Sequence, residues 1–234
     1  MRFVVACLVV AGGIVAATAA SPQNTPAPAA ATDVYHVHFA KAAPGQAAAL
    51  GKSLMAPDKA SPMPEHFVVL RHQEGDDWDY VVIQHLGSKA EVTPTAPPPS
   101  DAVRALSAWH SDTFVGGPSW AEFSKEMSFG GSTNGLVYLV GVHRAVPGHR
   151  EQLFRSLSAA GPSVKIQTGT VLLQHLEGSE WTFATITRYN SWQDVATERA
   201  AAASAGDTAG GWADIRQHSA FHRDTLADRI HPAK

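Results

Sequence analysis

The sequence predicts an α+β fold made of two tandem βαββαβ units, and three observations predict it. The stretch VYHVHFAKAAPGQ (34–46) returns as VYLVGVHRAVPGH (137–149). Sliding the chain against itself by 103 positions aligns 34–92 with 137–195 without a gap. Each copy also shows the same order of strand, helix and hairpin patterns. A duplicated structural unit accounts for all three.

The N-terminus predicts export. Arg2 precedes an apolar run, and the small residues Ala17-Thr18-Ala19 suit a signal peptidase, so residues 1–19 are predicted to be a signal peptide. The run is short for a membrane anchor. Residues 20–32 are rich in Pro and Ala and predict a disordered linker. We therefore expect a periplasmic or secreted protein, with no membrane attachment after cleavage and no cysteine once Cys7 is removed.

Each unit is expected to open with a strand, at 34–40 or 136–143, because these segments are rich in β-branched and aromatic residues. A helix follows in each copy. Pro44 and Pro147 suit its first turn, and pairs of leucines at i, i+4 spacing predict its buried face.

A hairpin comes next in each copy, around the loops EGDD and EGSE. Ser88 and Ser191 then stand where an N-cap would start a second helix. The last strand is the least defined element, and our candidates are EMSF near Phe129 and LADRI near Ile230. The repeated SAWHSDTF (107–114) and SAFHRDTL segments precede these candidates.

This order is that of the ferredoxin-like unit, whose four-stranded antiparallel sheet carries both helices on one side. We assign the first unit to residues 33–130 and the second to residues 135–231. The bare face of each sheet needs cover, and two units in one chain can cover each other. The predicted architecture is therefore two sheets packed face to face as a pseudo-dimeric α/β barrel.

At these residues the chain resembles the dimeric α/β-barrel superfamily, which includes antibiotic-biosynthesis monooxygenases, stress-responsive barrel proteins and haem-degrading oxygenases. The resemblance rests on the opening strand, the A-x-P-G motif before the first helix (Ala42 to Gly45 and its repeat) and the E-G-x-x-W hairpin. It covers most of the chain, and its motifs mark the fold rather than a reaction. It implies a ligand pocket between two sheets and an intramolecular pseudo-dimer. We expect this pseudo-dimer to be monomeric, with further self-association as the alternative.

Strand alternation separates the two faces of each sheet. The set shared by both copies, such as Tyr35 and Tyr138, is assigned to the helix-covered core. The opposite set is assigned to the pocket between the sheets, and it contains His36 and His38, which the second copy lacks. A one-residue shift of register would reverse every assignment.

His36 and His38 are the candidate catalytic residues, because i, i+2 spacing places two imidazoles on one side of a strand, about 7 Å apart at Cα. A histidine with a pKa near 6.5 can act as a general base at neutral pH. An ordinary hydrogen-bonded pair remains the alternative. We assign no metal site, since the sequence shows no third ligand beside them. The candidate substrate-binding residues on the same faces are Arg71, Tyr80, Gln84, His143, Gln174 and Thr187.

His110 and His222 recur in an H-x-D-T pattern that could orient a histidine by a carboxylate. Because the pattern occurs in both copies, we favour a structural role, in which Asp and Thr cap or turn the chain. Trp78 and Trp181 are likewise predicted to be packing residues.

The function predicted is that of an exported small-molecule-binding barrel protein, monooxygenase-like if it is an enzyme, acting on an apolar or aromatic substrate. A non-catalytic haem- or metal-binding protein and a purely structural module are the alternatives. The lead hypothesis needs no cofactor, and haem stays possible because one axial histidine suffices. The net charge of −3 without a basic cluster argues against nucleic acid. No G-x-S-x-G, H-E-x-x-H, C-x-x-C or phosphate-binding loop occurs.

Overall fold

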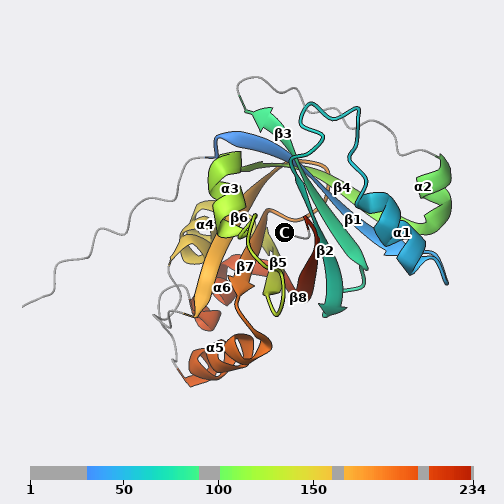
Figure 1. The fold of residues 1–234 in the computed structure, drawn as a ribbon. Helices are drawn as coiled ribbons and strands as arrows, with labels where there is room; N and C mark the ends of the chain where they lie inside the picture. The colour runs from blue at the N-terminus through green and yellow to red at the C-terminus, as the bar shows by residue number, and fades with distance from the viewer. Residues whose placement is uncertain (1–30, 90–100, 160–165, 205–210, 233–234) are drawn as a thin grey trace, which may run out of the picture.

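The computed structural model describes residues 31–89, 101–159, 166–204 and 211–232. The predicted signal peptide and nearly all of the predicted linker lie outside these ranges. Within them the chain is α+β, with six helices around eight antiparallel strands that close into a barrel (Figure 1).

The first half of the chain contains β1 (Asp33–Ala42), α1 (Ala47–Leu54), β2 (Phe67–Glu74), β3 (Tyr80–Ser88), α2 (Asp101–Leu106) and β4 (Ser107–Gly117). A connecting helix, α3 (Trp120–Glu126), leads to the second half. That half contains β5 (Val137–Ala145), α4 (Arg150–Ser158), β6 (Gln167–Glu177), β7 (Phe183–Tyr189), α5 (Trp192–Ser204), α6 (Trp212–His218) and β8 (Ser219–His231).

Both halves arrange their strands in the same order. The first half reads β4-β1-β3-β2 and the second reads β8-β5-β7-β6. The halves join by pairing β2 with β8 and β4 with β6, so no sheet edge is left free in the closed barrel. The sheets are therefore continuous with each other through their edges, a feature that our prediction of two sheets packed face to face as an α/β barrel did not specify.

The predicted hairpin around the EGDD loop is confirmed in the first half, where Val68 pairs with Ile83 and Leu70 with Val81. Ser191 is also confirmed as a helix cap, because its hydroxyl accepts a 3.1 Å hydrogen bond from the backbone N–H of Asp194 in α5. Pro44 differs slightly from its prediction. It lies in the turn before α1, which begins at Ala47.

The predicted last strand of the first unit is wrong. Residues 126–129 end α3 and follow it, whereas the strand is β4, which contains the SAWHSDTF segment. The equivalent SAFHRDTL segment opens β8, and the predicted LADRI stretch continues the same strand. The H-x-D-T pattern is therefore part of a strand in both halves and does not turn the chain after a helix.

The H-x-D-T threonines tie the two halves together. The Thr225 hydroxyl of β8 accepts a 3.1 Å hydrogen bond from the backbone N–H of Asp76, in the hairpin loop of the first half. Thr113 of β4 accepts the reciprocal bond, 3.3 Å long, from Ser179 in the other hairpin loop. Each loop lies very close to the backbone of the opposite strand. A Cβ on Gly75, for example, would lie 2.5 Å from the Asp224 carbonyl oxygen of β8. The repeated E-G and H-x-D-T motifs are thus the two sides of one contact.

The barrel interior is filled by a single apolar cluster drawn from both halves. Its members alternate along the strands and include Tyr35, Val37, Tyr138 and Val140. Trp78 and Trp181 belong to it, 4% and 5% exposed, which confirms them as packing residues. The shared set of strand residues therefore lies between the sheets.

Our assignment of the two faces is accordingly reversed. The grouping by alternation is right, but the set with His36 and His38 lies on the outer face, the side that the helices cover. Alternation separates two faces without saying which is which. The physical reason is that the two halves pack against each other in the barrel interior. The apolar residues that recur in both halves therefore lie there. The outer faces meet different helices and diverge.

Helix α3 packs against one end of this interior. Phe123 stacks on Tyr35 with ring centroids 5.1 Å apart, and Met127 belongs to the same cluster. The Tyr35 hydroxyl donates to the Pro118 carbonyl at 2.7 Å, and the Tyr138 hydroxyl donates to the Met127 carbonyl at 2.9 Å. The connection between the halves thus also satisfies the buried phenols.

Because the core is common to both halves, we expect the barrel to unfold in one transition. Leu70→Ala and Leu173→Ala, one in each half and both fully buried, should each lower the free energy of unfolding by about 2–5 kcal/mol. Leu176→Ala, at a site 39% exposed, should change it by less than about 0.5 kcal/mol. Urea titrations followed by tryptophan fluorescence and by circular dichroism measure this. Two separate transitions would contradict a shared core.

Candidate functional site

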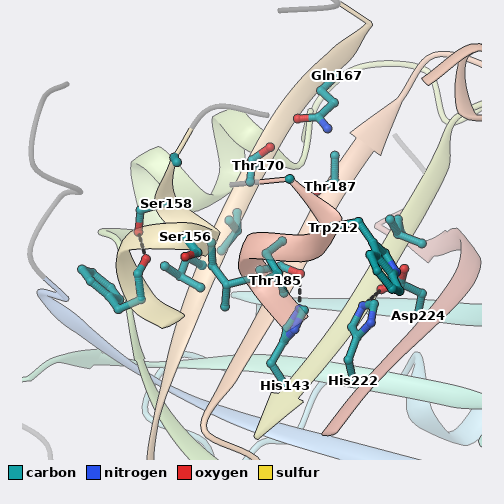
Figure 2. Close-up of a pocket in the computed structure, with 18 of the residues that line it drawn as sticks. His143, Ser156, Ser158, Gln167, Thr170, Thr185, Thr187, Trp212, His222 and Asp224 are labelled. Atoms are coloured by element: carbon teal, nitrogen blue, oxygen red, sulfur yellow. Dashed lines mark hydrogen bonds and ion pairs between the residues drawn. The ribbon is translucent and has the colours of Figure 1, made fainter. Parts of the chain in front are cut away.

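A pocket of about 880 Å³ lies in the second half, between the outer face of the sheet and the helices above it (Figure 2). Its floor comes from β5, β6, β7 and β8, and its roof from α4, α5 and α6. A cavity of this size can enclose a small organic molecule of several rings. The larger apolar side chains of the lining include Leu139, Phe154, Leu157, Leu172, Trp212 and Ile215.

Three of the predicted substrate-binding residues line this pocket. They are His143 on β5, Gln174 on β6 and Thr187 on β7. The prediction placed them on one face, and the structure does bring them to one cavity. That cavity lies beneath helices and not between the sheets, where the interior is filled.

The other three predicted residues lie in the first half and have internal partners. Arg71 forms a bidentate ion pair with Asp228, with nitrogen to oxygen distances of 3.1 and 2.7 Å. The Tyr80 hydroxyl donates to the Ala47 carbonyl at 2.8 Å beneath α1. Gln84 is buried, and its amide donates to the Met63 carbonyl at 2.6 Å. These side chains hold the β2–β8 pairing, α1 and the segment that precedes β2, respectively.

A polar group at the pocket floor centres on His222 and Asp224, which β8 projects to the same side. His222 Nε2 lies 2.8 Å from Asp224 Oδ1, and Arg199 of α5 donates to Asp224 Oδ2 at 2.9 Å. Burial raises the pKa of Asp224, but the His222 and Arg199 contacts outweigh it and hold the pKa below its usual value. Asp224 is therefore a stable anion that orients His222 from below.

His143 stacks on His222, with ring centroids 4.6 Å apart and planes at 14° (Figure 2). Its side chain is buried, Nε2 lies 3.5 Å from the Thr185 hydroxyl, and Nδ1 has no hydrogen-bond partner within the described residues. Burial, reinforced by the neighbouring His222, lowers the pKa of His143 to about 4. At neutral pH His143 is therefore an uncharged imidazole with an unused polar atom.

Gly141 makes room for this polar group. A Cβ at this position would lie 2.7 Å from the Thr185 hydroxyl, 3.0 Å from His143 Nε2 and 3.1 Å from Asp224 Oδ1. The first copy has His38 at the equivalent position. The loss of that histidine in the second copy therefore allows three polar side chains to converge at the pocket floor.

This arrangement can perform general base chemistry. A carboxylate bonded to one nitrogen of an imidazole fixes its ring and tautomer and stabilises the imidazolium that forms when the ring takes a proton. His222 and Asp224 supply that pair, and His143 supplies a neutral hydrogen-bonding group beside it. The apolar walls leave space for an aromatic ligand above them.

The candidate catalytic residues His36 and His38 lie elsewhere, on the outer face of β1. Both approach Asp112 of β4, at 2.8 Å in each case. They are not among the residues that line the second-half pocket. The structure thus separates the predicted base residues from three of the predicted binding residues.

Sequence reasoning missed His222 and Asp224 as site residues, although the signal was present. The H-x-D-T pattern was noticed, and its repetition favoured a structural role. The structural interpretation holds for Thr225, which bonds to a hairpin loop. The alternative, a histidine oriented by a carboxylate, holds for His222 and Asp224, which line the pocket. Nothing in the sequence pointed to Arg199, which reaches Asp224 from α5 only through the fold.

Comparison with known proteins supports the fold and not a family. No family model and no curated protein matches the sequence. Among solved structures, the chain is similar to an anthrone oxidase-like protein, with a TM-score of 0.57, 10% identity, and coverage of 86% of this chain and 92% of the other. It is also similar to a "putative monooxygenase" from Lactobacillus acidophilus NCFM, with a TM-score of 0.48 and 9% identity over 85% of this chain and 94% of the other. At these identities the likeness to the first protein concerns the fold alone.

Within the described residues, no helix has the length and apolar character needed to cross a membrane.

The buried neutral His143 predicts a specific pH dependence. In the unfolded chain a histidine binds a proton below about 6.5, whereas folded His143 does so only below about 4. The contribution of His143 to the free energy of unfolding is therefore fully present above pH 6.5. It falls by about 3 kcal/mol as the pH drops from 6.5 towards 4.

His143→Ala, which introduces the residue found at the equivalent position 40, should flatten the fall in unfolding free energy between pH 6.5 and 4. Urea unfolding at several pH values measures it. Phe154→Ala removes a non-titrating side chain from the same pocket, so it should lower stability by the same amount at every pH. An unchanged slope in His143→Ala would show that His143 is not a buried neutral base.

Proposed function

We propose that this chain is a monooxygenase-like enzyme that binds an apolar, aromatic small molecule in the second-half pocket, with His222 as general base and Asp224 as its orienting carboxylate. The observation that carries the proposal is the His222–Asp224–Arg199 chain at the floor of a cavity with apolar walls. The fold shared with an anthrone oxidase-like protein supports it.

The proposed reaction needs dioxygen as the second substrate. His222 removes a proton from an activated methylene of the aromatic ligand, and the resulting anion gives electrons to dioxygen. For a methylene the balance is R2CH2 + O2 → R2C=O + H2O, so one oxygen atom enters the product and the other leaves as water. Carbon loses the four electrons that dioxygen gains.

His143 and Thr185 would hold the developing oxyanion by hydrogen bonds in this scheme. A neutral imidazole can donate a hydrogen bond to an oxyanion through one nitrogen, and His143 lines the pocket with its Nε2 3.5 Å from the Thr185 hydroxyl. Trp212 and Phe154 would cover the aromatic rings from the helices, excluding water from the anion.

Anthrone is a suitable probe, because it is aromatic, apolar and has an activated methylene. Oxygen uptake with anthrone, corrected for its spontaneous oxidation, should fall by about 10²–10⁴-fold in His222→Ala, the range for loss of a general base. Asp224→Asn should lower it as well, since the ring of His222 loses its orienting charge. Quenching of tryptophan fluorescence measures binding separately.

His110→Ala is the matched control, because His110 is the equivalent of His222 in the first half and lies away from the pocket. It should keep wild-type oxygen uptake. Equal losses in His110→Ala and His222→Ala would contradict the assignment of the site. Absence of both binding and uptake above the blank would contradict the proposed substrate class.

We further propose that residues 33–130 and 135–231 are two ferredoxin-like repeats and that one chain forms the whole barrel as a monomer. The identical strand order of the two halves supports the repeat. The closure of the barrel within one chain supports the monomer, because both sheet edges are already paired.

Export is part of the same proposal and has its own test. If residues 1–19 are a signal peptide, the protein recovered from outside the cytoplasm should begin near Ala20, which N-terminal sequencing or intact mass measures. Ala17→Leu and Ala19→Leu together should block this cleavage, because signal peptidase needs small residues there. A full-length chain in the cytoplasm, with Met1 retained, would contradict export.

A further inference from the structure

A second polar group lies on the outer face of the first half, where β1 and β4 pair. His38 is directly opposite Asp112, and Ala40 is opposite His110. Since alternate residues share a face, His36 and His38 of β1 lie on the same side as His110 and Asp112 of β4. Three imidazoles and one carboxylate therefore meet on two neighbouring strands.

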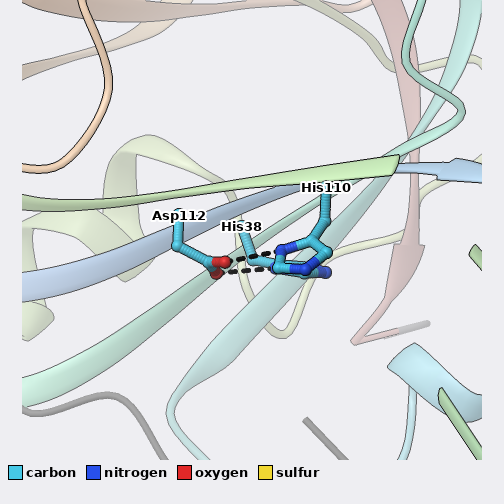
Figure 3. Close-up of side chains that lie close together, drawn as sticks. All are labelled: His38, His110 and Asp112. Atoms are coloured by element: carbon cyan, nitrogen blue, oxygen red, sulfur yellow. Dashed lines mark hydrogen bonds and ion pairs between the residues drawn. The ribbon is translucent and has the colours of Figure 1, made fainter. Parts of the chain in front are cut away.

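The side chains of this group converge on the carboxylate. His38 Nδ1 lies 2.8 Å from Asp112 Oδ1, and His110 Nδ1 lies 2.7 Å from Asp112 Oδ2 (Figure 3). His36 Nε2 also comes within 2.8 Å of Asp112 Oδ1, but without the direction of a hydrogen bond, and it is buried with no other partner in the described chain. One carboxylate oxygen thus faces two imidazole nitrogens.

The spacing suits a metal ion. One ligand atom from each of His38, His110 and Asp112 lies within 4.8 Å of the others. Imidazole nitrogens and carboxylate oxygens bind Zn²⁺ at about 2.0–2.2 Å, so they stand a little over 3 Å apart around a tetrahedral ion. Small rotations of exposed or half-buried side chains would bring the group to that spacing.

The second half lacks this group, because it has only two of the four corresponding residues. His222 and Asp224 correspond to His110 and Asp112, but Leu139 and Gly141 replace His36 and His38. The free oxygen of Asp224 binds Arg199 instead. The two additional histidines are therefore specific to the first half, and no element of the repeated barrel interior depends on them.

We propose that His38, His110 and Asp112 form the core of a binding site for one divalent transition-metal ion, of which Zn²⁺ fits best, and that His36, beside Asp112, turns to become the fourth ligand. Three nitrogens and one oxygen are a common ligand set for Zn²⁺. Magnesium and calcium prefer sets made of oxygen, and soft monovalent copper prefers sulfur. The His110 side chain is 40% exposed, which leaves a way for the ion to enter from solvent.

An ordinary hydrogen-bonded cluster is the competing interpretation, and the arrangement of His36 distinguishes the two. A single carboxylate oxygen can accept bonds from two histidines only if both direct an N–H at it. His36 approaches without that direction, and its Nε2 has no alternative partner among the residues that the structure describes. A metal ion would give this nitrogen a role that the carboxylate does not.

The test uses the untagged mature protein, stripped with a chelator and titrated with Zn²⁺ by isothermal calorimetry. We expect one ion per chain. Co²⁺ serves as a spectroscopic probe, because a tetrahedral site gives intense visible absorption bands that six-coordinate aqueous Co²⁺ lacks. Loss of one ligand, in His38→Ala or Asp112→Asn, should weaken Zn²⁺ binding by at least about 100-fold, since even changes to residues behind the ligands cost 10–100-fold.

Matched variants come from the repeat itself. His36→Leu introduces the residue that the second half carries at the equivalent position, so it should fold and still lose affinity. His222→Ala changes the corresponding histidine of the second half and should bind Zn²⁺ as the wild type does. Circular dichroism of each stripped variant confirms that lost binding is not lost folding.

Three results would overturn the proposal. They are the absence of stoichiometric binding to the folded wild type, binding that survives in both His38→Ala and Asp112→Asn, and binding removed equally by His222→Ala. Because the site shares no residue with the second-half pocket, the first two results do not bear on the proposed oxygenation, whereas the third would place the ion at His222.

Discussion

The reciprocal contact between each hairpin loop and the opposite half is the constraint on which the barrel depends. A loop glycine of one half approaches the backbone of the H-x-D-T strand of the other, and the threonine of that strand accepts a hydrogen bond from the loop. This contact accompanies the β2–β8 and β4–β6 pairings that close the barrel. Closure in turn excludes water from the apolar cluster that both halves supply.

This closure also decides where a ligand can bind. With the interior occupied by aromatic and branched side chains, the remaining space lies between the outer face of the sheet and the helices. The second half keeps such a space because α4, α5 and α6 stand over a floor that includes Gly141. In the first half, α1 packs closely on the sheet, and Gly51 lies so close to Tyr80 that a Cβ there would be 2.7 Å from its hydroxyl. The space between the outer face of the sheet and the helices is therefore filled by side chains under α1 in the first half and forms a pocket in the second half.

The two halves share a strand order but differ in the chemistry of their outer faces. Both halves place a histidine and an aspartate two residues apart on the outer side of a strand, β4 in the first half and β8 in the second. In each strand the pair comes just before the threonine that bonds to the hairpin loop of the opposite half. In the second half the pair lies at the floor of a pocket and is bound to an arginine. In the first half it meets two further imidazoles. The threonine next to the aspartate makes the same hydrogen bond to a hairpin loop in both halves, so its identity is constrained. The neighbouring residues on the outer face do not take part in this contact, and they differ between the halves.

The sequence by itself determined the match between residues 34–92 and 137–195, the order of strands and helices through the hairpins, and the packing role of Trp78 and Trp181. These follow from local propensity and from matches between the copies. It also grouped the strand residues by face, and so placed His143, Gln174 and Thr187 together. Only the tertiary structure decided which face is inside, since alternation is symmetric and the answer depends on how two sheets close. Only the fold brings Arg199 to Asp224 and His110 to His38, because these pairs are separated along the chain and meet through strand pairing and helix packing.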